Sequence, residues 1–486
     1  MRKLLVCLML VPATASAANT LKVGPNQMYA KPCAAITAAQ AGDTIEVDAA
    51  GSYSDDSCSW STDGLTVRGV NGRAKIDASG GPLSNGKGIF VISANNATIE
   101  NMELSGAKVT DLNGAGIRHQ GLNLVVRNCL FHDNENGILS GPPTPNTGSM
   151  LIENSEFHDN SLDDNGYSHN MYIGQYASFT LRYSWSHHIP GNGDVGHLVK
   201  TRAWKNYILY NRITGEDGHE SNEINVPQGG TTYIIGNLIE KASTPKNSNF
   251  VNYAFDDGVK NGDDHLFVVN NTFVNASGGG TFLLVGPQVM TPVMLVNNIF
   301  KGPGTIATQV SAKQMNNFAD GMGDPLFLDA PNFDYHLKPG SPCVDKGIDP
   351  GMGMGMSLLP TQQYVHPTSA EGRMIAGTAI DIWRRREPSG RRRRLRIFVG
   401  VGLAGRLQLR PHFTVPEPWS ERHRCRHLFR LLAAQTEVES LPSLRCVFPG
   451  RAQTHAALVC VDSQSPGPAQ AEAADQRRAR FPHRHL

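Results

Sequence analysis

The sequence has no apolar run of the roughly 20 residues that a membrane-spanning helix needs, and it contains neither an HExxH motif nor paired CxxC motifs. These absences argue against an integral membrane protein and against the commonest zinc sites. Only 8 of the 486 residues are cysteine. Cys33 and Cys58 are close enough in sequence to form a disulfide in an oxidising compartment, although buried free thiols are an equally good interpretation.

Residues 1–18, MRKLLVCLMLVPATASAA, have the pattern of a secretory signal peptide. Two cations, Arg2 and Lys3, precede a short apolar stretch, and small residues follow it at Ala15 and Ala17. We therefore expect the mature protein to be soluble and to work in a periplasm or outside the cell.

The end of the chain has a different composition from the rest. Residues 383–486 contain no Lys, Asn, Tyr or Met, and carry a net charge of +12, whereas residues 1–382 carry −11. Such an abrupt change suggests a shifted reading frame, so we interpret residues 383–486 as an Arg-rich, frameshifted tail without stable structure. A nucleic-acid-binding role for Arg391–Arg394 fits poorly with export, and we expect no nucleic-acid partner.

Between these two ends, one phrase recurs: a short apolar strand, then Asn or Ser, then a large apolar residue. The closing apolar residues are Leu104, Phe131, Phe157, Trp185, Ile213, Ile239, Phe273 and Phe300, with spacings of 27, 26, 28, 28, 26, 34 and 27. A period of this length, with alternating strands and Gly/Asn-rich turns, is typical of a β-solenoid. The recurring Asn residues are expected to form a ladder at one corner.

The repeat length matches one turn of a three-stranded parallel coil, so the predicted fold class is all-β, a parallel β-helix. We assign residues 19–350 to the coil with its N-terminal cap, in which a short Ala-rich helix precedes the first strand, and residues 351–382 to a closing segment. Gly351–Met356, GMGMGM, reads as a flexible link. A capped coil has no need of a partner subunit, and we expect a monomer.

The middle turns, SHNMYIG, GHLVKTR, SNEINVP and NFVNYAF, differ from the others. Period-2 alternation places one set of side chains inward and the next outward. The predicted inward set is Met171, Ile173, Val199, Thr201, Ile224, Val226, Val251 and Tyr253. The predicted outward set is Asn170, Tyr172, Leu198, Lys200, Arg202, Glu223, Asn225 and Asn252. Stacking of the turns should gather the outward set into one patch.

The patch combines two cations, a carboxylate, a phenol and amides, with His169, His197 and His219 in neighbouring loops. It suits an acidic, extended substrate. Arg202 could bind a carboxylate with two hydrogen bonds, and Lys200, beside a second cation and partly desolvated, could serve as a base. A non-catalytic anion-binding patch or an ordinary solvated edge remain alternative interpretations.

These features together resemble the pectate-lyase-like superfamily of right-handed parallel β-helices over roughly residues 20–382. The VKTR run is similar to the strand in alginate lyases and chondroitin B lyase where a VKS segment supplies the catalytic Lys. In that family an Arg on the next turn acts with the Lys, and acidic residues hold calcium against the substrate carboxylate. Here the next turn, SNEINVP, has no Arg.

The resemblance implies a polysaccharide lyase that cleaves a uronic-acid-containing polysaccharide by β-elimination. Lys200 would remove the proton, Arg202 or a cation near Glu223 and Asn225 would neutralise the carboxylate, and Tyr172 or His197 would protonate the leaving oxygen. The substrate-binding candidates are Asn170, His169, His219, Asn225 and Asn252, and Glu223 is a possible calcium ligand; no other cofactor is implied.

Other functions on the same coil are also open. A uronate epimerase would begin with the same proton abstraction. A polygalacturonase-like hydrolase would use Asp clusters, for which Asp163–Asp164, Asp256–Asp257 and Asp263–Asp264 are available, but its NTD, DD and RIK phrases are missing as a set. These Asp pairs are better explained as loop caps or structural cation ligands. A non-catalytic polysaccharide-binding protein is the remaining alternative.

Overall fold

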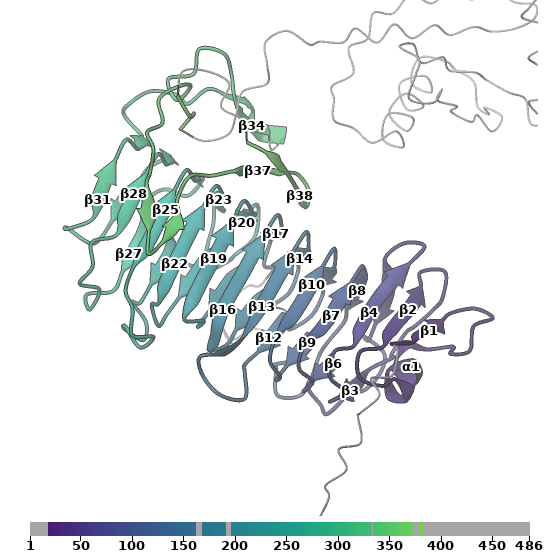
Figure 1. Cartoon of the computed structure of the whole chain (residues 1–486). Coiled ribbons are helices and arrows are strands. Elements are labelled where there is room, and N and C mark those ends of the chain that lie inside the picture. Colours follow the sequence, from purple (N-terminus) through teal and green to yellow (C-terminus); the bar gives the residue numbers. More distant parts are fainter. Residues whose placement is uncertain (1–17, 162–167, 191–195, 333, 374–378, 383–486) are drawn as a thin grey trace, which may run out of the picture. The chain divides into compact units, whose positions relative to one another are not determined.

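The computed structural model describes residues 18–161, 168–190, 196–332, 334–373 and 379–382. The predicted tail, nearly all of the predicted signal peptide, and Asp163–Asp164 lie outside these residues. The described chain is built on three long parallel sheets, one of 12 strands and two of 10 (Figure 1). Among the described residues, no helix is long and apolar enough to cross a membrane.

In each sheet the strands lie side by side in the order in which they occur along the chain. Sheet A consists of β1 (Thr20–Val23), β2 (Thr44–Asp48), β4 (Thr66–Val70), β7 (Ala97–Glu100), β10 (Leu124–Arg127), β13 (Thr147–Glu153), β16 (Tyr176–Arg182), β19 (Lys205–Leu209), β22 (Thr231–Ile235), β25 (Leu266–Val269), β28 (Met294–Val296) and β31 (Lys313–Met315). Sheet B consists of β3 (Cys58–Trp60), β6 (Gly88–Ile92), β9 (Ala115–His119), β12 (Asn136–Ser140), β15 (Met171–Ile173), β18 (Val199–Thr201), β21 (Ile224–Val226), β24 (Asn249–Tyr253), β27 (Thr281–Val285) and β30 (Thr305–Ala307). Sheet C consists of β5 (Ala74–Asp77), β8 (Met102–Ser105), β11 (Leu130–His132), β14 (Glu156–His158), β17 (Trp185–His187), β20 (Arg212–Thr214), β23 (Leu238–Lys241), β26 (Thr272–Asn275), β29 (Ile299–Lys301) and β32 (Phe318–Ala319).

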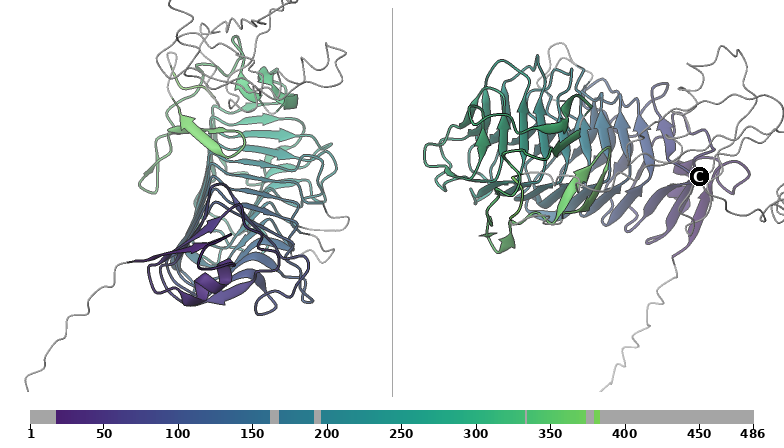
Figure 2. Two further views of the ribbon diagram at one scale, coloured as in Figure 1. Left: turned by 90° about the vertical axis from the view of Figure 1, so that its right-hand side faces the viewer. Right: turned by 90° about the horizontal axis from the view of Figure 1, so that it is seen from above.

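Each turn of the coil contributes one strand to sheet A, then one to sheet C, then one to sheet B, so neighbours within a sheet come from successive turns. Figure 2 shows these turns stacked one on another. Every strand inside the stack pairs on both sides, and the pairing is parallel and in register. The parallel coil that the repeat predicts is confirmed.

Aliphatic side chains fill the interior in rows that run from turn to turn. One row on sheet A joins residues that are directly opposite each other and fully buried: Ile45, Val67, Ile99, Val126, Ile152, Leu181, Ile208, Ile234, Val268 and Leu295. Parallel strands buried on one face against such rows gain most of their stability from this apolar contact. The predicted inward set on sheet B is confirmed, because all eight side chains are buried.

The predicted Asn ladder lies at the corner between sheets A and C. Equivalent positions are occupied by Asn211, Asn237, Asn271, Asn298 and Asn317. Oδ1 of each of the last four accepts the main-chain N–H of the preceding Asn at 2.9 Å, and Oδ1 of Asn211 accepts that of Ser184 at 3.0 Å. Each Nδ2 also donates to a main-chain carbonyl. These side chains therefore satisfy buried main-chain groups where the strands end and no ladder partner is available.

The repeat pattern predicts the wrong inward residue in one turn. Phe157 lies opposite Ser186, which lies opposite Ile213, so Ser186 and not Trp185 takes the inward position in this turn. Trp185 lies on the outer side, where its ring stacks on His187 with a centroid distance of 3.6 Å. In this turn the large apolar residue stands one position earlier in the phrase than in the other turns, and a displacement of one residue along a strand places a side chain on the opposite face.

The N-terminal cap contains the expected short helix, α1 (Pro32–Ala38), at the end of the stack beside β1 and β3 (Figure 1). The predicted order is wrong, however, because β1 precedes the helix and extends sheet A by pairing with β2. Cys33 in α1 and Cys58 in β3 form a disulfide with a Cα–Cα distance of 5.6 Å. Cys129 and Cys343 are free and buried.

After β32 the chain folds back over the coil in short antiparallel pairs: β33 (Phe327–Asp329) with β34 (Asp334–Leu337), β35 (Met352–Gly353) with β36 (Met356–Ser357), and β37 (Gln362–Val365) with β38 (Ser369–Gly372). A 3-10 turn spans Ala330–Asn332. The GMGMGM segment is a hairpin rather than the flexible link predicted for it. Gly353 packs on Phe267, where a side chain would collide with the ring, and its carbonyl accepts the Tyr233 hydroxyl at 3.0 Å.

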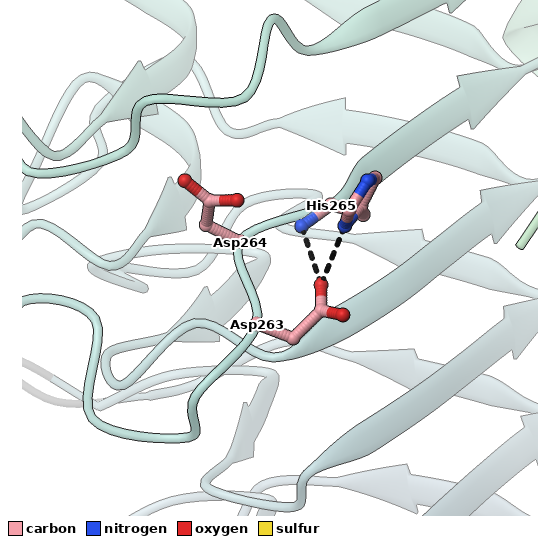
Figure 3. A group of neighbouring side chains, drawn as sticks. All are labelled: Asp263, Asp264 and His265. Carbon is pink, nitrogen blue, oxygen red and sulfur yellow. Dashed lines mark hydrogen bonds and ion pairs between the residues drawn. The ribbon is translucent and has the colours of Figure 1, made fainter.

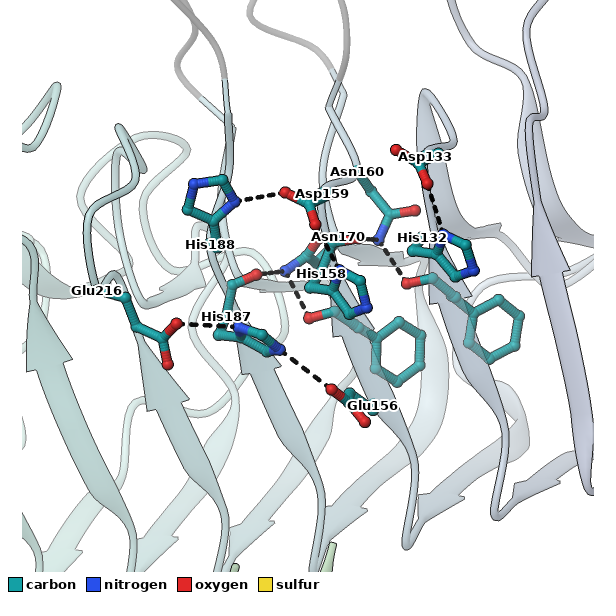
Figure 4. Close-up of polar contacts among 12 residues, drawn as sticks. His132, Asp133, Glu156, His158, Asp159, Asn160, Asn170, His187, His188 and Glu216 are labelled. Atoms are coloured by element: carbon teal, nitrogen blue, oxygen red, sulfur yellow. Dashed lines mark hydrogen bonds and ion pairs between the residues drawn. The ribbon is translucent and has the colours of Figure 1, made fainter. Parts of the chain in front are cut away.

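A row of imidazole rings lies on the outer side of sheet C (Figure 4). His132 stacks on His158 at 5.3 Å, and His158 lies 5.1 Å from His187. Carboxylates flank each ring; Asp133 lies 2.6 Å from His132, and Asp159 2.6 Å from His158. The rings and carboxylates form a series of hydrogen-bonded pairs whose strength depends on protonation.

Replacing Asn237 by Ala should destabilise the protein by about 3 kcal/mol, because the main-chain N–H of Asn211 and the carbonyl of Ile208 lose their buried partner. The midpoint of urea denaturation measures this loss. The exposed Gln314→Ala on β31 is the control and should leave the midpoint unchanged. An equal midpoint for both variants would show that the ladder contributes nothing.

The hydrogen bond that the His132 ring donates to Glu103 raises the pKa of His132 above its usual value, and the same bond lowers the pKa of Glu103 to about 2. Stability from the charged His132 ring is therefore present below about pH 6.5 and is lost as the pH rises through the raised pKa. We expect His132→Gln to cost about 1 kcal/mol near pH 5.5 and much less near pH 9. Denaturation across this pH range, with His219→Gln as control, tests it; a cost independent of pH would contradict it.

Candidate active site

The four middle turns align one side chain each in a single row across sheet B, in which Tyr172 and Lys200 are half-buried and Asn225 and Asn252 are buried beneath the loop that follows β24. Tyr172 lies opposite Lys200, Lys200 opposite Asn225, and Asn225 opposite Asn252. Parallel strands lie about 4.8 Å apart, so these side chains are immediate neighbours. The predicted gathering of these four residues is confirmed.

Lys200 occupies the centre of the row and is half-buried. Its Nζ lies 5.1 Å from the centre of the Tyr172 ring, a distance at which a cation is attracted to the ring face. Burial, and secondarily the charge of Arg202, lowers the pKa of Lys200 to about 8, although Asp256 and Asp257 act in the opposite direction. A substantial fraction of this amine is therefore neutral in mildly alkaline solution, as a general base requires.

Arg202 lies two residues further along and has a different environment. Its guanidinium lies 5.6 Å from the centre of the same Tyr172 ring, and its Nη1 forms an ion pair with Asp257. Gln228 also donates to Asp257, at 3.2 Å. The two cations are thus not equivalent: Arg202 is neutralised by a carboxylate, whereas no ion pair of Lys200 occurs in the described part of the chain.

Asp256 also lies at the row, a position that the sequence pattern does not predict. Its side chain is exposed, and its two oxygens accept N–H groups from Asn252 at 2.8 Å and from Asn225 at 3.0 Å. Asp256 and Asp257 were interpreted as loop caps or cation ligands. Asp256 and Asp257 follow the end of β24 by three and four residues. A loop at a strand end can fold over the face of that strand, so this spacing is the one sequence feature that indicates a position near the row.

His169 and His197 stack beside the row with a centroid distance of 4.9 Å. Their Nδ1 atoms accept main-chain N–H groups of the next turn, from His197 at 3.1 Å and from Asn222 at 3.2 Å. Burial holds the pKa of both rings well below the usual value, with the charge of Lys200 acting in the same direction. Both rings are therefore neutral near pH 7 and are poor proton donors.

Three residues of the predicted outward set face the interior instead. Asn170, Leu198 and Glu223 are fully buried. The strands that follow them begin at Met171, Val199 and Ile224 and are three residues long, so strict alternation does not extend to the preceding residue. Asn170 donates to the carbonyl of His187 at 2.9 Å, which removes it from the substrate-binding candidates.

Glu223 is also unsuited to the calcium role predicted for it. It forms a fully buried ion pair with Lys241 at 2.9 Å, and burial raises its pKa well above the usual value. No contact among the described residues joins His219 to the row. Its Nδ1 lies 3.1 Å from the carbonyl of Thr244.

A group of three potential metal ligands, Asp263, Asp264 and His265, occurs elsewhere, before β25 (Figure 3). Asp264 already accepts the main-chain N–H groups of Met290 at 2.7 Å and Thr291 at 3.0 Å. Asp263 accepts that of His265 at 2.8 Å. These bonds fit the interpretation of this Asp pair as a loop cap.

The active-site row fits calcium poorly. Calcium takes six to eight oxygen ligands, whereas the carboxylates here already accept amide and guanidinium N–H groups, from Asn225 and Asn252 to Asp256 and from Arg202 to Asp257. The reaction that we propose for this site therefore involves only side chains of this chain.

No protein-family model and no curated protein matches the sequence. Among solved structures, the pectate lyase Pel9A is similar, with a TM-score of 0.54 and 16% identity over 76% of this chain and 97% of that one. A PL6 family polysaccharide lyase from Pseudopedobacter saltans has a TM-score of 0.34 at 12% identity, covering 65% of this chain and 97% of that one. The A-module of an Azotobacter vinelandii mannuronan C-5 epimerase has 0.31 at 14%, covering 59% and 94%.

The likeness to the pectate lyase establishes the fold. The described chain is a right-handed parallel β-helix.

Replacing Asp256 by Asn should lower the pKa of Lys200 further, because Asp256 is one of the two carboxylates that raise it. Acylation of Lys200, followed by peptide mass spectrometry across a pH series, measures this pKa without any assumption about activity. We expect half-maximal acylation near pH 8 in the parent protein and at a lower pH in the variant. Asp263→Asn serves as control; a shift toward higher pH in Asp256→Asn would contradict the assigned geometry.

Proposed function

We propose that this protein is a polysaccharide lyase that cleaves a uronic-acid-containing polysaccharide by β-elimination. The observation that carries the proposal is the environment of Lys200: a half-buried amine without an ion-pair partner in the described chain, its pKa lowered to about 8, within a row of polar side chains. The fold supports the proposal, because a solved structure with a similar fold is that of a pectate lyase.

In the proposed reaction the substrate carboxylate lies against the Arg202 guanidinium, next to the neutral amine of Lys200. The positive charge makes the proton on the carbon next to the carboxylate more acidic. Neutral Lys200 removes this proton, the electron pair of the broken C–H bond forms the new double bond, and the glycosidic C–O bond breaks. The products are an unsaturated uronate end and a sugar with a free hydroxyl.

The departing glycosidic oxygen needs a proton, and Tyr172 is the best placed donor. Its ring lies 5.1 Å from Nζ of Lys200, so the phenol and the amine can reach opposite ends of one elimination. His197 is the weaker candidate, since its ring is neutral and its Nε2 lies 3.1 Å from the Asn225 amide. After the reaction, Tyr172 regains a proton from the Lys200 ammonium or from water.

Hydrolysis is less well supported by the side chains. Glycosidases use one carboxylate and one carboxylic acid. Asp256 and Asp257 both accept N–H groups, including one from the Arg202 guanidinium, so their oxygens act as acceptors and neither carboxyl group is placed to donate a proton to a leaving group. Export to a periplasm or to the exterior, where such polymers occur, is part of the proposal.

Replacing Lys200 by Ala should abolish formation of unsaturated product on alginate, pectate and glycosaminoglycans, with a loss of at least about a thousandfold in kcat. Lys200→Arg keeps the charge but cannot act as a base at neutral pH, so it should be equally inactive while still binding polymer. Ultraviolet absorbance of the unsaturated end measures the rate, and Lys246→Ala, an exposed lysine, is the control.

The outcomes separate the alternatives. Undiminished turnover by Lys200→Ala would exclude this lysine as the base. Exchange of the sugar C–H proton with solvent deuterium, without any unsaturated product, would indicate an epimerase. Binding without either reaction by the parent protein would indicate a non-catalytic polysaccharide-binding protein.

A further inference from the structure

A second concave site lies next to the active-site row, where each turn passes from sheet B to sheet A. The cavity has a volume of about 540 Å³, within the roughly 300–1,000 Å³ typical of small-molecule sites. Ser178, Trp204, Lys205, Tyr207, Thr231 and Asp263 are among the residues that line it. Nothing in the proposed elimination uses these side chains.

The cavity is built by the same turns that carry the active-site row. Strand β15 with Tyr172 leads into Ser178, β18 with Lys200 leads into Trp204 and Lys205, and β21 with Asn225 leads into Thr231. On the far side of the corner, Ser178 lies opposite Lys205, and Lys205 opposite Thr231. A polymer that passes over Lys200 and across this corner would therefore meet the cavity next.

The corner between the two sites is held by a set of buried hydrogen bonds. Asn261 donates to the carbonyls of Arg202 at 3.2 Å, Ala203 at 3.1 Å and Gly229 at 3.1 Å. Gln228 donates to Asp257, which pairs with Arg202. The cavity wall and the Arg202 end of the row are thus parts of one rigid arrangement, and the cavity exists before any ligand binds.

The lining has the chemical character of a site for an acidic sugar. Trp204 and Tyr207 offer partly exposed aromatic rings, which pack well against the C–H face of a sugar ring. Lys205 is exposed and forms no ion pair with a described residue, so its ammonium can receive a carboxylate. Asp263 supplies carboxylate oxygens that accept sugar hydroxyl groups.

We propose that this cavity binds a second uronate unit of the polysaccharide whose cleavage takes place at Lys200. The inference rests on the proposed function for the identity of the polymer. Lys205 binds the carboxylate of that unit, Trp204 and Tyr207 support its ring, and Asp263 accepts its hydroxyls. The cavity thereby makes binding depend on the length of the chain.

The test measures binding separately from cleavage. In the Lys200→Ala background, calorimetry with di- and hexasaccharides of galacturonate and of mannuronate gives the Kd of each. Lys205→Glu should raise the Kd of the preferred hexasaccharide about tenfold and leave that of the disaccharide unchanged, whereas Lys205→Arg should restore most of the affinity. Lys313→Glu, an exposed lysine on β31 of the same sheet, is the matched control.

Each result is informative. Hexasaccharide binding that is unaffected by Lys205→Glu, or no binding of any hexasaccharide, overturns the second site. Binding that depends on Lys205, together with the absence of unsaturated product from the parent protein on every polymer, supports the site and rejects the lyase function. Dependence on Lys205 in binding and a raised KM with unchanged kcat in the cleaving enzyme support both.

Discussion

The in-register stacking of one turn on the next is the constraint from which the other features follow. On sheet B, main-chain pairing aligns Lys200 with Tyr172 in the turn before and with Asn225 in the turn after. On sheet A the same turns pair in register, which aligns the fully buried aliphatic row. Because a shift of one residue would reverse the faces of a strand, the buried rows fix which side chains can face outward. The polar row on sheet B is therefore a product of the apolar core.

The same stacking explains why the chemistry of Lys200 differs from that of an ordinary surface lysine. Adjacent turns place the Tyr172 ring and the Asn225 amide beside it, Arg202 follows it in the same turn, and burial among these neighbours removes water from its ammonium. Arg202 cannot take the same role, since Asp257 neutralises it. Two cations that look alike in the sequence thus divide their functions: one is available for proton transfer, and the other helps to hold the loop that follows β24.

Polar groups inside the coil show how the structure tolerates so many Asn and Glu residues. Asn237 and its equivalents complete the hydrogen bonding of buried main chain, so their burial is compensated. Glu223 and Lys241 compensate each other. His169 and His197 take the place of Asn in a similar arrangement, accepting main-chain N–H groups of the next turn through Nδ1. These buried imidazoles are therefore structural elements at the edge of the candidate site.

The sequence by itself determined the coil, its interior and the centre of the row. Alternation and period are local properties, and they suffice to place Lys200 beside Tyr172 and Asn225. Only the tertiary structure decided what happens beyond the strand ends. Strands of three residues leave Asn170 and Glu223 in turns, where contacts with distant residues such as Lys241 set the direction of the side chain. For the same reason Asp256 and the cavity beside Lys205, which depend on how loops from different turns meet, are absent from any local pattern.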